Sequence, residues 1–246
     1  MDLQNRVVLV TGASGGIGEA LARGVTQEGS RVVLFARREQ ELRRVQEAIG
    51  AQQAEVVVGD VANAADLQRA VAAAVERFGG LDILVNNAGV AVIGRLTNVP
   101  VELVERGWRT NVLGPILAVQ AAVPVMRQRG GGMIVNISSG MSLRPSATMG
   151  VYSMTKAALN LISASLREEL RDENIRVLTV FPGFLANDFG RHSLAADEEL
   201  VALRRATSWT RSSRTSEDAA RDIIAAIKAD AEVFRANREQ PLTMPL

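Results

Sequence analysis

The amino-acid sequence predicts an α/β protein with a doubly wound parallel sheet of about seven strands and helices on both faces. Three observations predict this fold. Short runs rich in Val and Ile alternate along the chain with longer segments in which apolar residues recur at helical period. The short runs are apolar on both faces, as in parallel sheets that helices cover from both sides. A glycine-rich turn follows the first run and leads into the first amphipathic segment, which is typical of a strand–turn–helix unit.

Each expected strand is a run of apolar and β-branched residues between turn-forming residues. Six such runs cover residues 6–10, 31–35, 55–58, 81–85, 132–137 and 175–181, and a seventh strand is expected around 232–235. Helical periodicity predicts helices at residues 17–28, 39–49, 64–78, 101–127, 152–172 and 216–229. Gly114 and Pro115 lie inside the fourth helix and are expected to disturb it. Because the chain shows no linker, repeat or low-complexity block, we expect one domain over residues 1–246.

One segment, residues 184–214, interrupts the alternation of strands and helices. It mixes large apolar residues with many charges and follows the last long strand. A connection of this length is typical of a functional lid or of a disordered segment. We expect a lid over the substrate site.

The composition excludes several classes of protein. Lys plus Arg number 28 against 27 Asp plus Glu, which favours neither nucleic acid nor an acidic membrane as a partner. There is no cysteine and a single histidine, His192, so thiol catalysis, disulfides and a cysteine or histidine metal site are excluded, and a Ser-His-Asp hydrolase is disfavoured. The N-terminus is too polar for a secretory signal, and no apolar stretch reaches the ~18 residues of a membrane span. We expect a cytoplasmic protein without a metal.

The glycine-rich turn, TGASGGIG at residues 11–18, is the first candidate binding site. Glycines let the backbone approach a phosphate closely, and the following helix N-terminus offers free N–H groups and a partial positive charge. The alternative is a glycine turn that holds no ligand. The residues expected to contact a dinucleotide here are Gly12, Ser14, Gly15, Gly16, Ile17 and Gly18.

The second strand is followed by Arg37 and Arg38, where an acidic residue would grip the ribose 2′-hydroxyl of NAD. Arginine instead suits the 2′-phosphate of NADP, because its guanidinium binds phosphate bidentately. We therefore expect NADP(H), with NAD(H) less favoured. Both arginines could alternatively be solvated at the start of the helix at 39–49. After the third strand, Asp60 and Val61 are placed to read the adenine, although Asp60 could equally be a turn residue.

Tyr152, the only tyrosine of the chain, precedes Lys156 by four residues in a predicted helix, so the two side chains share one face. A cation about 4 Å away would favour the phenolate by roughly 4 kcal/mol at an effective dielectric near 20. That energy corresponds to up to roughly three pKa units, enough to bring the phenol near pH 7. Alone, the pair could be a half-buried aromatic beside an unrelated surface lysine.

These motifs occur together with several others in a fixed order. They are TGASGGIG at 11–18, NNAG at 86–89, Asn111, the serines at 138–139, YSMTK at 152–156, and Pro182-Gly183. In this order and spacing they resemble the short-chain dehydrogenase/reductase family, in the form with chains of about this length. The resemblance covers the chain from the first strand to about Gly183. It implies a Rossmann-type domain that binds a nicotinamide dinucleotide.

The resemblance implies roles for the residues of the reaction centre. Tyr152 would exchange a proton with the substrate oxygen, and Lys156 would lower its pKa and bind the nicotinamide ribose. Ser139, rather than Ser138, would hydrogen-bond the substrate carbonyl, and Asn111 would hold water that links Lys156 to solvent. Such donors suit the negative charge that develops on a carbonyl oxygen during hydride addition. The serines could instead simply end a strand, and Asn111 could be an ordinary helix residue.

The resemblance also places further contacts to the dinucleotide. The residues Asn87, Ala88 and Gly89 would lie beside the adenosine ribose, although this is also an ordinary turn composition. Pro182 and Gly183 would lie at the nicotinamide end. A threonine usually follows them in the family and contacts the carboxamide. This chain has none at that place, and Asn187 is its expected replacement.

We interpret the sequence as an NADP(H)-dependent carbonyl reductase or alcohol dehydrogenase. The expected pocket walls, Met141, Leu143, Met149 and residues 90–93, favour a rather apolar substrate, while His192 is either a solvated lid residue or a second acid. The family resemblance implies a homodimer or homotetramer built on the helices at 101–127 and 152–172. The alternative from another class is a non-catalytic NADP-binding sensor or scaffold. A sugar epimerase or dehydratase, an acyl-carrier-protein reductase and a module of a larger synthase fit the sequence less well.

Overall fold

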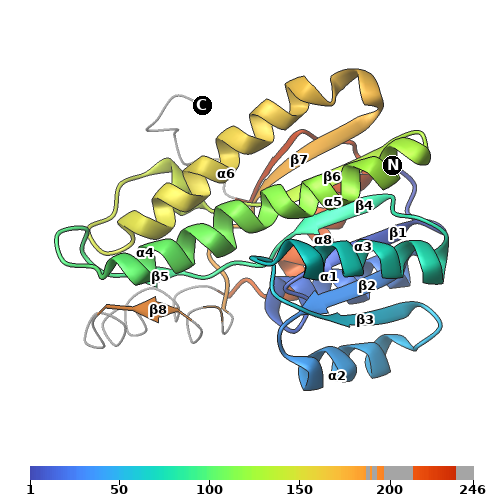
Figure 1. Ribbon diagram of the computed structural model, residues 1–246, viewed down its shortest axis with the longest axis horizontal. Coiled ribbons are helices and arrows are strands. Elements are labelled where there is room, and N and C mark those ends of the chain that lie inside the picture. Colours follow the sequence, from blue (N-terminus) through green and yellow to red (C-terminus); the bar gives the residue numbers. More distant parts are fainter. Residues whose placement is uncertain (187–188, 190–192, 197–212, 237–246) are drawn as a thin grey trace.

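A seven-stranded parallel sheet forms the centre of the molecule, in the order β3-β2-β1-β4-β6-β7-β9 (Figure 1). The computed structural model describes residues 1–186, 189, 193–196 and 213–236. Within these ranges the doubly wound α/β fold predicted from the sequence is confirmed. The strands are β1 (Val7–Thr11), β2 (Arg31–Ala36), β3 (Ala54–Val58), β4 (Ile83–Asn86), β6 (Gly132–Ile137), β7 (Ile175–Phe181) and β9 (Val233–Arg235).

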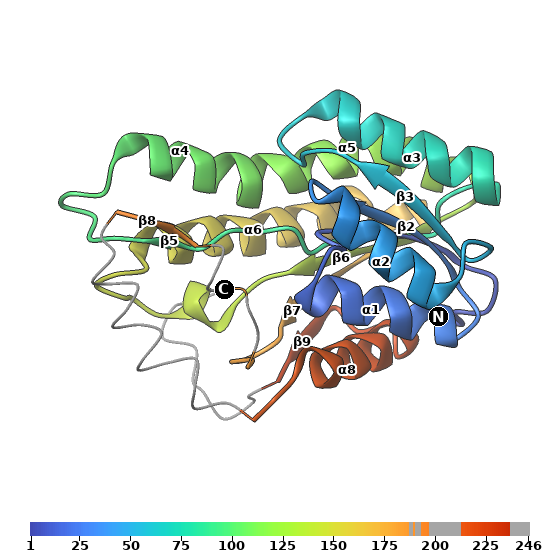
Figure 2. The same cartoon turned by 90° about the horizontal axis from the view of Figure 1, so that it is seen from below.

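Helices cover both faces of the sheet, and each begins and ends within three residues of its prediction apart from the interrupted fourth one. Figure 2 shows α1, α2 and α8 on one side, with α3 and α5 on the other. The helices are α1 (Gly16–Gln27), α2 (Glu39–Ile49), α3 (Ala64–Phe78), α4 (Val101–Trp108), α5 (Gly114–Gln128), α6 (Gly150–Glu169) and α8 (Ser216–Lys228). A single turn of 3-10 helix, Arg171–Glu173, follows α6.

The two apolar cores follow from the alternation of side chains along each strand. In β1, Val8 and Val10 pack in the cluster under α1 and α8, whereas Val7 and Leu9 pack in the cluster under α3 and α5. All four side chains are fully or almost fully buried, which explains why this strand reads as an uninterrupted apolar run.

The connections of β1 and β4 leave the sheet on opposite faces. The chain passes from β1 through α1 to β2, and from β4 through α4 and α5 to β6. In doubly wound sheets, the crevice outside the carboxyl ends of such neighbouring strands is where ligands bind. The fold therefore brings the segments after β1 and β4 to one crevice.

The helix predicted at residues 101–127 is divided into α4 and α5 by a π-helical turn, Arg109–Leu113. The disturbance expected from Gly114 and Pro115 is thus present, although it lies just before them. A Cβ on Gly114 would lie 3.0 Å from a methyl carbon of Val61, so the glycine allows the helix to pass close to the turn after β3. π-turns of this kind occur frequently at functional sites.

A second, two-stranded sheet was not predicted. The strands β5 (Val92–Ile93) and β8 (Leu194–Ala195) are parallel, and β8 belongs to the segment expected to form a lid. Backbone bonds from Leu194 to Ala91 (2.8 Å) and from Ala196 to Ile93 (2.9 Å) join them. Residues 194–196 of this segment are therefore attached beside β5.

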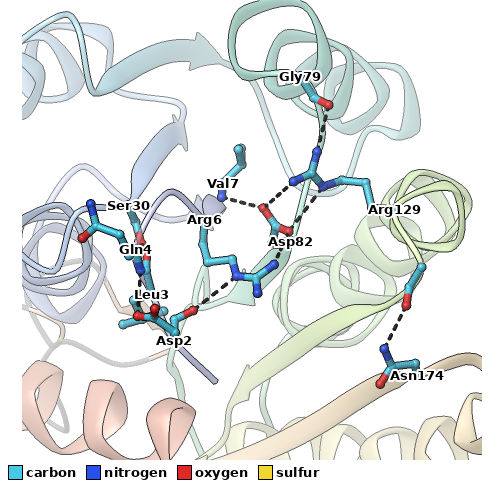
Figure 3. Close-up of polar contacts among 11 residues, drawn as sticks. Asp2, Leu3, Gln4, Arg6, Val7, Ser30, Gly79, Asp82, Arg129 and Asn174 are labelled. Atoms are coloured by element: carbon cyan, nitrogen blue, oxygen red, sulfur yellow. Dashed lines mark hydrogen bonds and ion pairs between the residues drawn. The ribbon is translucent and has the colours of Figure 1, made fainter.

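A buried carboxylate joins several elements at the amino ends of the strands (Figure 3). Asp82, 3 % exposed, accepts hydrogen bonds from Val7 N (2.8 Å), Arg6 Nη1 (3.1 Å) and Arg129 Nε (3.3 Å). These bonds connect the start of β1, the start of β4 and the end of α5. Paired and hydrogen-bonded in this way, the charge can remain buried. No helix in the described ranges is long and apolar enough to cross a membrane.

Candidate active site

Hydrogen bonds connect the carboxyl end of β6 to α6. They come from four successive residues, three through their side chains and one through its backbone carbonyl. Asn136 Nδ2 donates to Ser163 Oγ (2.8 Å), and Lys156 Nζ donates to the carbonyl oxygen of Ile137 (2.7 Å). Ser138 Oγ donates to the side-chain oxygen of Asn160 on α6 (2.5 Å). The side chains of Ser139 and Tyr152 are hydrogen-bonded to each other. The bonds of Ile137, Ser138 and Ser139 thus hold Ser139, Tyr152 and Lys156 together, while the bond from Asn136 to Ser163 lies farther along α6.

A cavity of about 620 Å³ extends from these residues to the glycine-rich turn after β1. It lies at the crevice where the sheet topology predicts ligand binding. The predicted site residues that line it are Gly12, Ser14, Gly15, Gly16, Ile17, Arg37, Arg38, Asp60, Val61, Asn87, Ala88, Gly89, Ser139, Tyr152, Lys156, Pro182 and Gly183. Gly18 and Asn111 do not line it. Asn187 and His192 lie outside the described residues.

The expectation that Lys156 lowers the phenol's pKa toward 7 is wrong for this structure. Burial raises the pKa of Tyr152 to about 12, and the hydrogen bond from Ser139 opposes this rise only in part. Burial also lowers the pKa of Lys156 to about 8. The phenolate and the ammonium both lose hydration in the interior. This loss outweighs the stabilisation of the phenolate that was expected from an ammonium one helical turn away. The phenol is therefore protonated at neutral pH.

The two serines of the 138–139 pair have different surroundings. Ser138 Oγ turns toward α6, where it donates to the side chain of Asn160 (2.5 Å) and more weakly to the carbonyl oxygen of Lys156 (3.5 Å). Ser139 caps a 3-10 helix, Gly140–Leu143, with Oγ accepting from Met141 N (3.2 Å). Its side chain also bonds Tyr152. Geometry thus favours Ser139, as expected, as the serine beside the phenol.

Asn111 lies in the π-turn and is fully buried. Its Oδ1 accepts from Val90 N (2.8 Å), while its Nδ2 donates to Val90 O (2.8 Å) and to Thr155 Oγ1 (3.0 Å). Thr155 Oγ1 donates in turn to the carbonyl oxygen of Tyr152 (2.8 Å). The amide therefore connects the segment after β4 to the helix of the tyrosine, and both of its N–H groups are engaged by protein atoms.

The glycine-rich turn is built for close approach of backbone atoms. Gly12 has φ +68°, a conformation that favours glycine, and a Cβ there would lie 2.9 Å from Ala88 Cα. A Cβ on Gly18 would collide with the carbonyl oxygen of Gly12, so Gly18 serves packing behind the turn. Asn87 Nδ2 donates to the carbonyl oxygen of Thr11 (2.9 Å) and braces the turn. The other residues of the turn, from Ser14 to Ile17, line the cavity.

Basic side chains lie at the outer end of the cavity. Arg38 donates through Nη2 to Ser14 O and Ser14 Oγ, both at 3.0 Å, and has no carboxylate partner among the described residues. Arg37 pairs with Asp60 at 3.7 Å across an exposed edge. A cation that touches the glycine-rich turn and is not neutralised by a carboxylate fits a phosphate group of a dinucleotide.

The cavity also contains residues that the sequence argument did not single out. Glu19, directly after Gly18, binds Arg44 bidentately at 2.9 and 2.6 Å, and Glu41 binds the same guanidinium at 3.2 Å. These hydrogen bonds raise the pKa of Arg44. Glu19 could have been predicted from the sequence, because it follows the glycine motif directly and lies in the first turn of α1. Arg44 could not be placed, since contact between α1 and α2 depends on the fold.

Apolar side chains line the end of the cavity beside Tyr152. The ring of Phe189 lies 5.9 Å from that of Tyr152 at an angle of 53°. The others are Val90, Ala91, Met141, Met149, Phe184 and Leu185. The predicted walls were partly wrong, because Val92 and Ile93 are buried in β5 and Leu143 does not line the cavity. No group of three or more His, Asp or Glu side chains gathers as a metal site within the described ranges.

The chain is similar to several known proteins. The sequence model of the short chain dehydrogenase family matches residues 6–198. Dehydrogenase/reductase SDR family member 4 of Bos taurus is 38 % identical over 192 residues, which are 77 % of this chain and 69 % of that protein. An uncharacterized oxidoreductase of Staphylococcus epidermidis is 34 % identical over 194 residues, 76 % of this chain and 84 % of its own.

Solved structures share the whole fold. A short chain dehydrogenase/reductase from Burkholderia phymatum in complex with NAD superposes with a TM-score of 0.88 at 23 % identity, covering 100 % of this chain and 99 % of its own. The closed form of a serine dehydrogenase complexed with NADP+ gives 0.84 at 26 % identity, covering 97 % and 100 %. The family itself is shown by the sequence model over residues 6–198 and by relatives more than 30 % identical to this chain. The chain therefore belongs to the short-chain dehydrogenase family of oxidoreductases.

Proposed function

We propose that this protein is an NADP(H)-dependent oxidoreductase that interconverts a carbonyl compound and an alcohol, with Tyr152 as the acid and base. One observation carries the proposal: Ser139, Tyr152 and Lys156 line the same cavity as the glycine-rich turn. The cofactor supplies the hydride. The chain supplies orientation, hydrogen-bond donors and a proton.

Tyr152 and Ser139 would both donate hydrogen bonds to the substrate oxygen. In reduction, the phenol is already protonated at neutral pH because burial raises its pKa to about 12. As negative charge develops on the carbonyl oxygen, the phenol proton moves to that oxygen and Ser139 stabilises it. In oxidation the phenolate of Tyr152 would accept the alcohol proton and return to the phenol. Lys156, with a pKa of about 8, would stabilise the phenolate that forms and bind the nicotinamide ribose.

The chain offers contacts along the length of a dinucleotide. Phosphates would bind the turn formed by Gly12, Ser14, Gly15, Gly16 and Ile17. Asp60 and Val61 would contact the adenine, and the residues Asn87, Ala88 and Gly89 would lie by the adenosine ribose. Pro182, Gly183 and Asn187 would lie at the nicotinamide end, and Asn111 would contribute through the π-turn.

Preference for NADP over NAD is supported by the charge at the outer end of the cavity. Arg38 lies on Ser14 without a carboxylate partner in the described ranges, and Arg37 is only loosely paired with Asp60. No carboxylate follows β2 directly, where one would bind the 2′-hydroxyl of NAD. The serine dehydrogenase noted above, 26 % identical, is complexed with NADP+.

A homodimer or homotetramer and a rather apolar substrate are further parts of the proposal. Trp108 on α4 and Met154 and Leu161 on α6 are large apolar residues left exposed. Such a group of side chains is typical of an interface between subunits. Met141, Met149 and Phe184 supply an apolar wall beside the reaction centre. We place the protein in the cytoplasm.

The test is a screen of aldehydes, ketones and alcohols with NADPH, NADP+, NADH and NAD+, followed through the nicotinamide absorbance. Turnover that depends on Tyr152 and prefers the phosphorylated coenzyme supports the proposal. Coenzyme binding without turnover of any substrate would favour the alternative, a non-catalytic NADP-binding sensor or scaffold. The presence of Ser139, Tyr152 and Lys156 in one cavity favours the enzyme.

A further inference from the structure

One face of α6 carries three polar side chains at successive helical turns: Tyr152, Lys156 and Asn160. A spacing of four residues stacks them toward the end of β6. The first two have roles in the proposed function, whereas Asn160 lies one turn beyond them and does not line the cavity. It is 7 % exposed, and an asparagine is a weak helix former, so its place there requires another explanation.

Asn160 uses both ends of its amide on the segment that carries Ser139. Its Oδ1 accepts from Ser138 Oγ (2.5 Å), and its Nδ2 donates to Ser142 Oγ (2.9 Å). Ser142 Oγ then donates to the carbonyl oxygen of Ser139 (2.6 Å). Ser138 and Ser142 are 3 % and 5 % exposed, so these bonds are shielded from water.

These hydrogen bonds hold the backbone on both sides of Ser139. Ser138 precedes it, and Ser142 is three residues later in the same 3-10 turn, Gly140–Leu143. Gly140 between them has open space around it and gives the turn little packing of its own. An amide suits this place because it donates and accepts at once, which leucine and aspartate do not.

We propose that Asn160 is a positioning residue that fixes the orientation of Ser139 toward Tyr152. This inference rests on the proposed function, because it assigns to Asn160 an effect on the serine that binds the substrate oxygen. Asn160 acts through Ser138, Ser142 and the 3-10 turn. It touches neither substrate nor coenzyme.

The first test is Asn160→Leu, with Ser163→Ala as the matched control. Ser163 is also buried on α6 and receives a hydrogen bond from a side chain of β6, Asn136 Nδ2 at 2.8 Å. A misplacement of a reacting group by about 1 Å can lower turnover about 100-fold. We expect kcat to fall about 10- to 100-fold in Asn160→Leu with coenzyme Kd unchanged, and to stay within about threefold in Ser163→Ala. Equal kcat losses in both would overturn the proposal.

A double-mutant cycle separates positioning from general damage to the fold. If Asn160 acts through Ser139, the loss caused by Asn160→Leu disappears, to within about threefold, when Ser139 is already alanine. The same fold loss in both backgrounds would refute the assignment. Ser142→Ala is a smaller change that breaks the same chain of bonds. It keeps the test open if Asn160→Leu does not fold, and it is expected to act in the same direction.

A readout without turnover separates failure of this inference from failure of the proposed function. Tyr152 is the only tyrosine, so ¹³C labelling at its phenolic carbon gives one NMR signal. Loss of the Ser139 hydrogen bond should shift that signal in Ser139→Ala, and Asn160→Leu should reproduce the shift while Ser163→Ala does not. An unshifted signal in Asn160→Leu would overturn the positioning role, even if no substrate is found. A shifted signal without any turnover would count against the proposed function alone.

Discussion

The ammonium nitrogen of Lys156 lies 2.7 Å from the carbonyl oxygen of Ile137, the last residue of β6. This bond directs the lysine toward the strand end while the phenol of Tyr152 bonds Ser139. Both side chains are buried, so their neutral forms are favoured: burial raises the pKa of Tyr152 to about 12 and lowers the pKa of Lys156 to about 8. In the proposed reaction, the phenol of Tyr152 is therefore ready to donate a proton to a substrate oxygen.

The buried lysine gives a prediction about stability and pH. Below about pH 8 Lys156 is charged in the folded and unfolded chain alike, so its lost hydration opposes folding in full. Between about pH 8 and its ordinary value of 10.5, the folded chain binds fewer protons than the unfolded one, and this penalty falls as pH rises. Above about pH 10 Tyr152 acts in the opposite sense, because its raised pKa keeps it protonated only in the folded chain.

We therefore expect Lys156→Met to raise the free energy of unfolding at pH 7, by up to about 3 kcal/mol at about 1.4 kcal/mol per pKa unit. The gain should shrink toward pH 10. Urea denaturation of both proteins at pH 7 and pH 10 measures the difference. A gain of the same size at both pH values would contradict the assigned pKa of the lysine.

Removal of the phenol hydroxyl should abolish turnover. Tyr152→Phe keeps the ring and its contact with Phe189 but removes the proton that the reaction needs. We expect kcat to fall by at least about 100-fold, the usual contribution of a positioned acid, with NADPH binding nearly unchanged. Steady-state kinetics and coenzyme fluorescence titration measure the two effects. Turnover that survives within a few-fold would show that another group is the acid.

Coenzyme preference should depend on the basic residues after β2. Arg37→Asp places a carboxylate where it repels the 2′-phosphate and can bind a 2′-hydroxyl, so we expect NADPH binding to weaken by about 2 kcal/mol, roughly 30-fold. The ratio of NADPH to NADH affinity should narrow or reverse. Arg43→Asp is the control, because it makes the same charge change on the exposed face of α2. An equal effect of the two variants would indicate long-range charge rather than contact.

The exposed apolar residues of α4 and α6 should lie between subunits. Leu161 on α6 is 70 % exposed. We expect Leu161→Glu to convert the proposed oligomer to smaller species, because a buried interface would have to desolvate the new charge. Size-exclusion chromatography with light scattering measures the mass. Val75→Glu on α3, also an exposed apolar residue, should leave the mass unchanged. An unchanged mass in Leu161→Glu would place the interface elsewhere.

The sequence was sufficient for the large elements, because each long strand is a run of apolar residues and each helix has an amphipathic period. It was not sufficient for β5 and β8, since two residues cannot show a period and their pairing joins distant segments. The π-turn was foreseen only as a disturbance near Gly114. It lies directly before Gly114, which is in close contact with Val61 in the turn after β3.

The candidate site was predicted where a motif determines geometry locally, as in the glycine turn and the Tyr152–Lys156 pair. The pKa of Tyr152 was predicted in the wrong direction because residue spacing gives proximity and says nothing about burial. Asn160 and Ser142 were missed because a single polar residue in a helix or loop has no distinguishing pattern. Their hydrogen bonds exist only once β6 and α6 are packed together.

The carboxylate of Asp82 stands immediately before β4, and the cavity begins just beyond the other end of the same strand. The hydrogen bonds of Arg6 and Arg129 to Asp82 thus lie at the amino ends of the strands, a full strand length from the rim of the cavity. Residues on the rim can therefore be substituted without touching the ion pairs of Asp82. The same separation makes the rim a suitable region for engineering new substrate preferences.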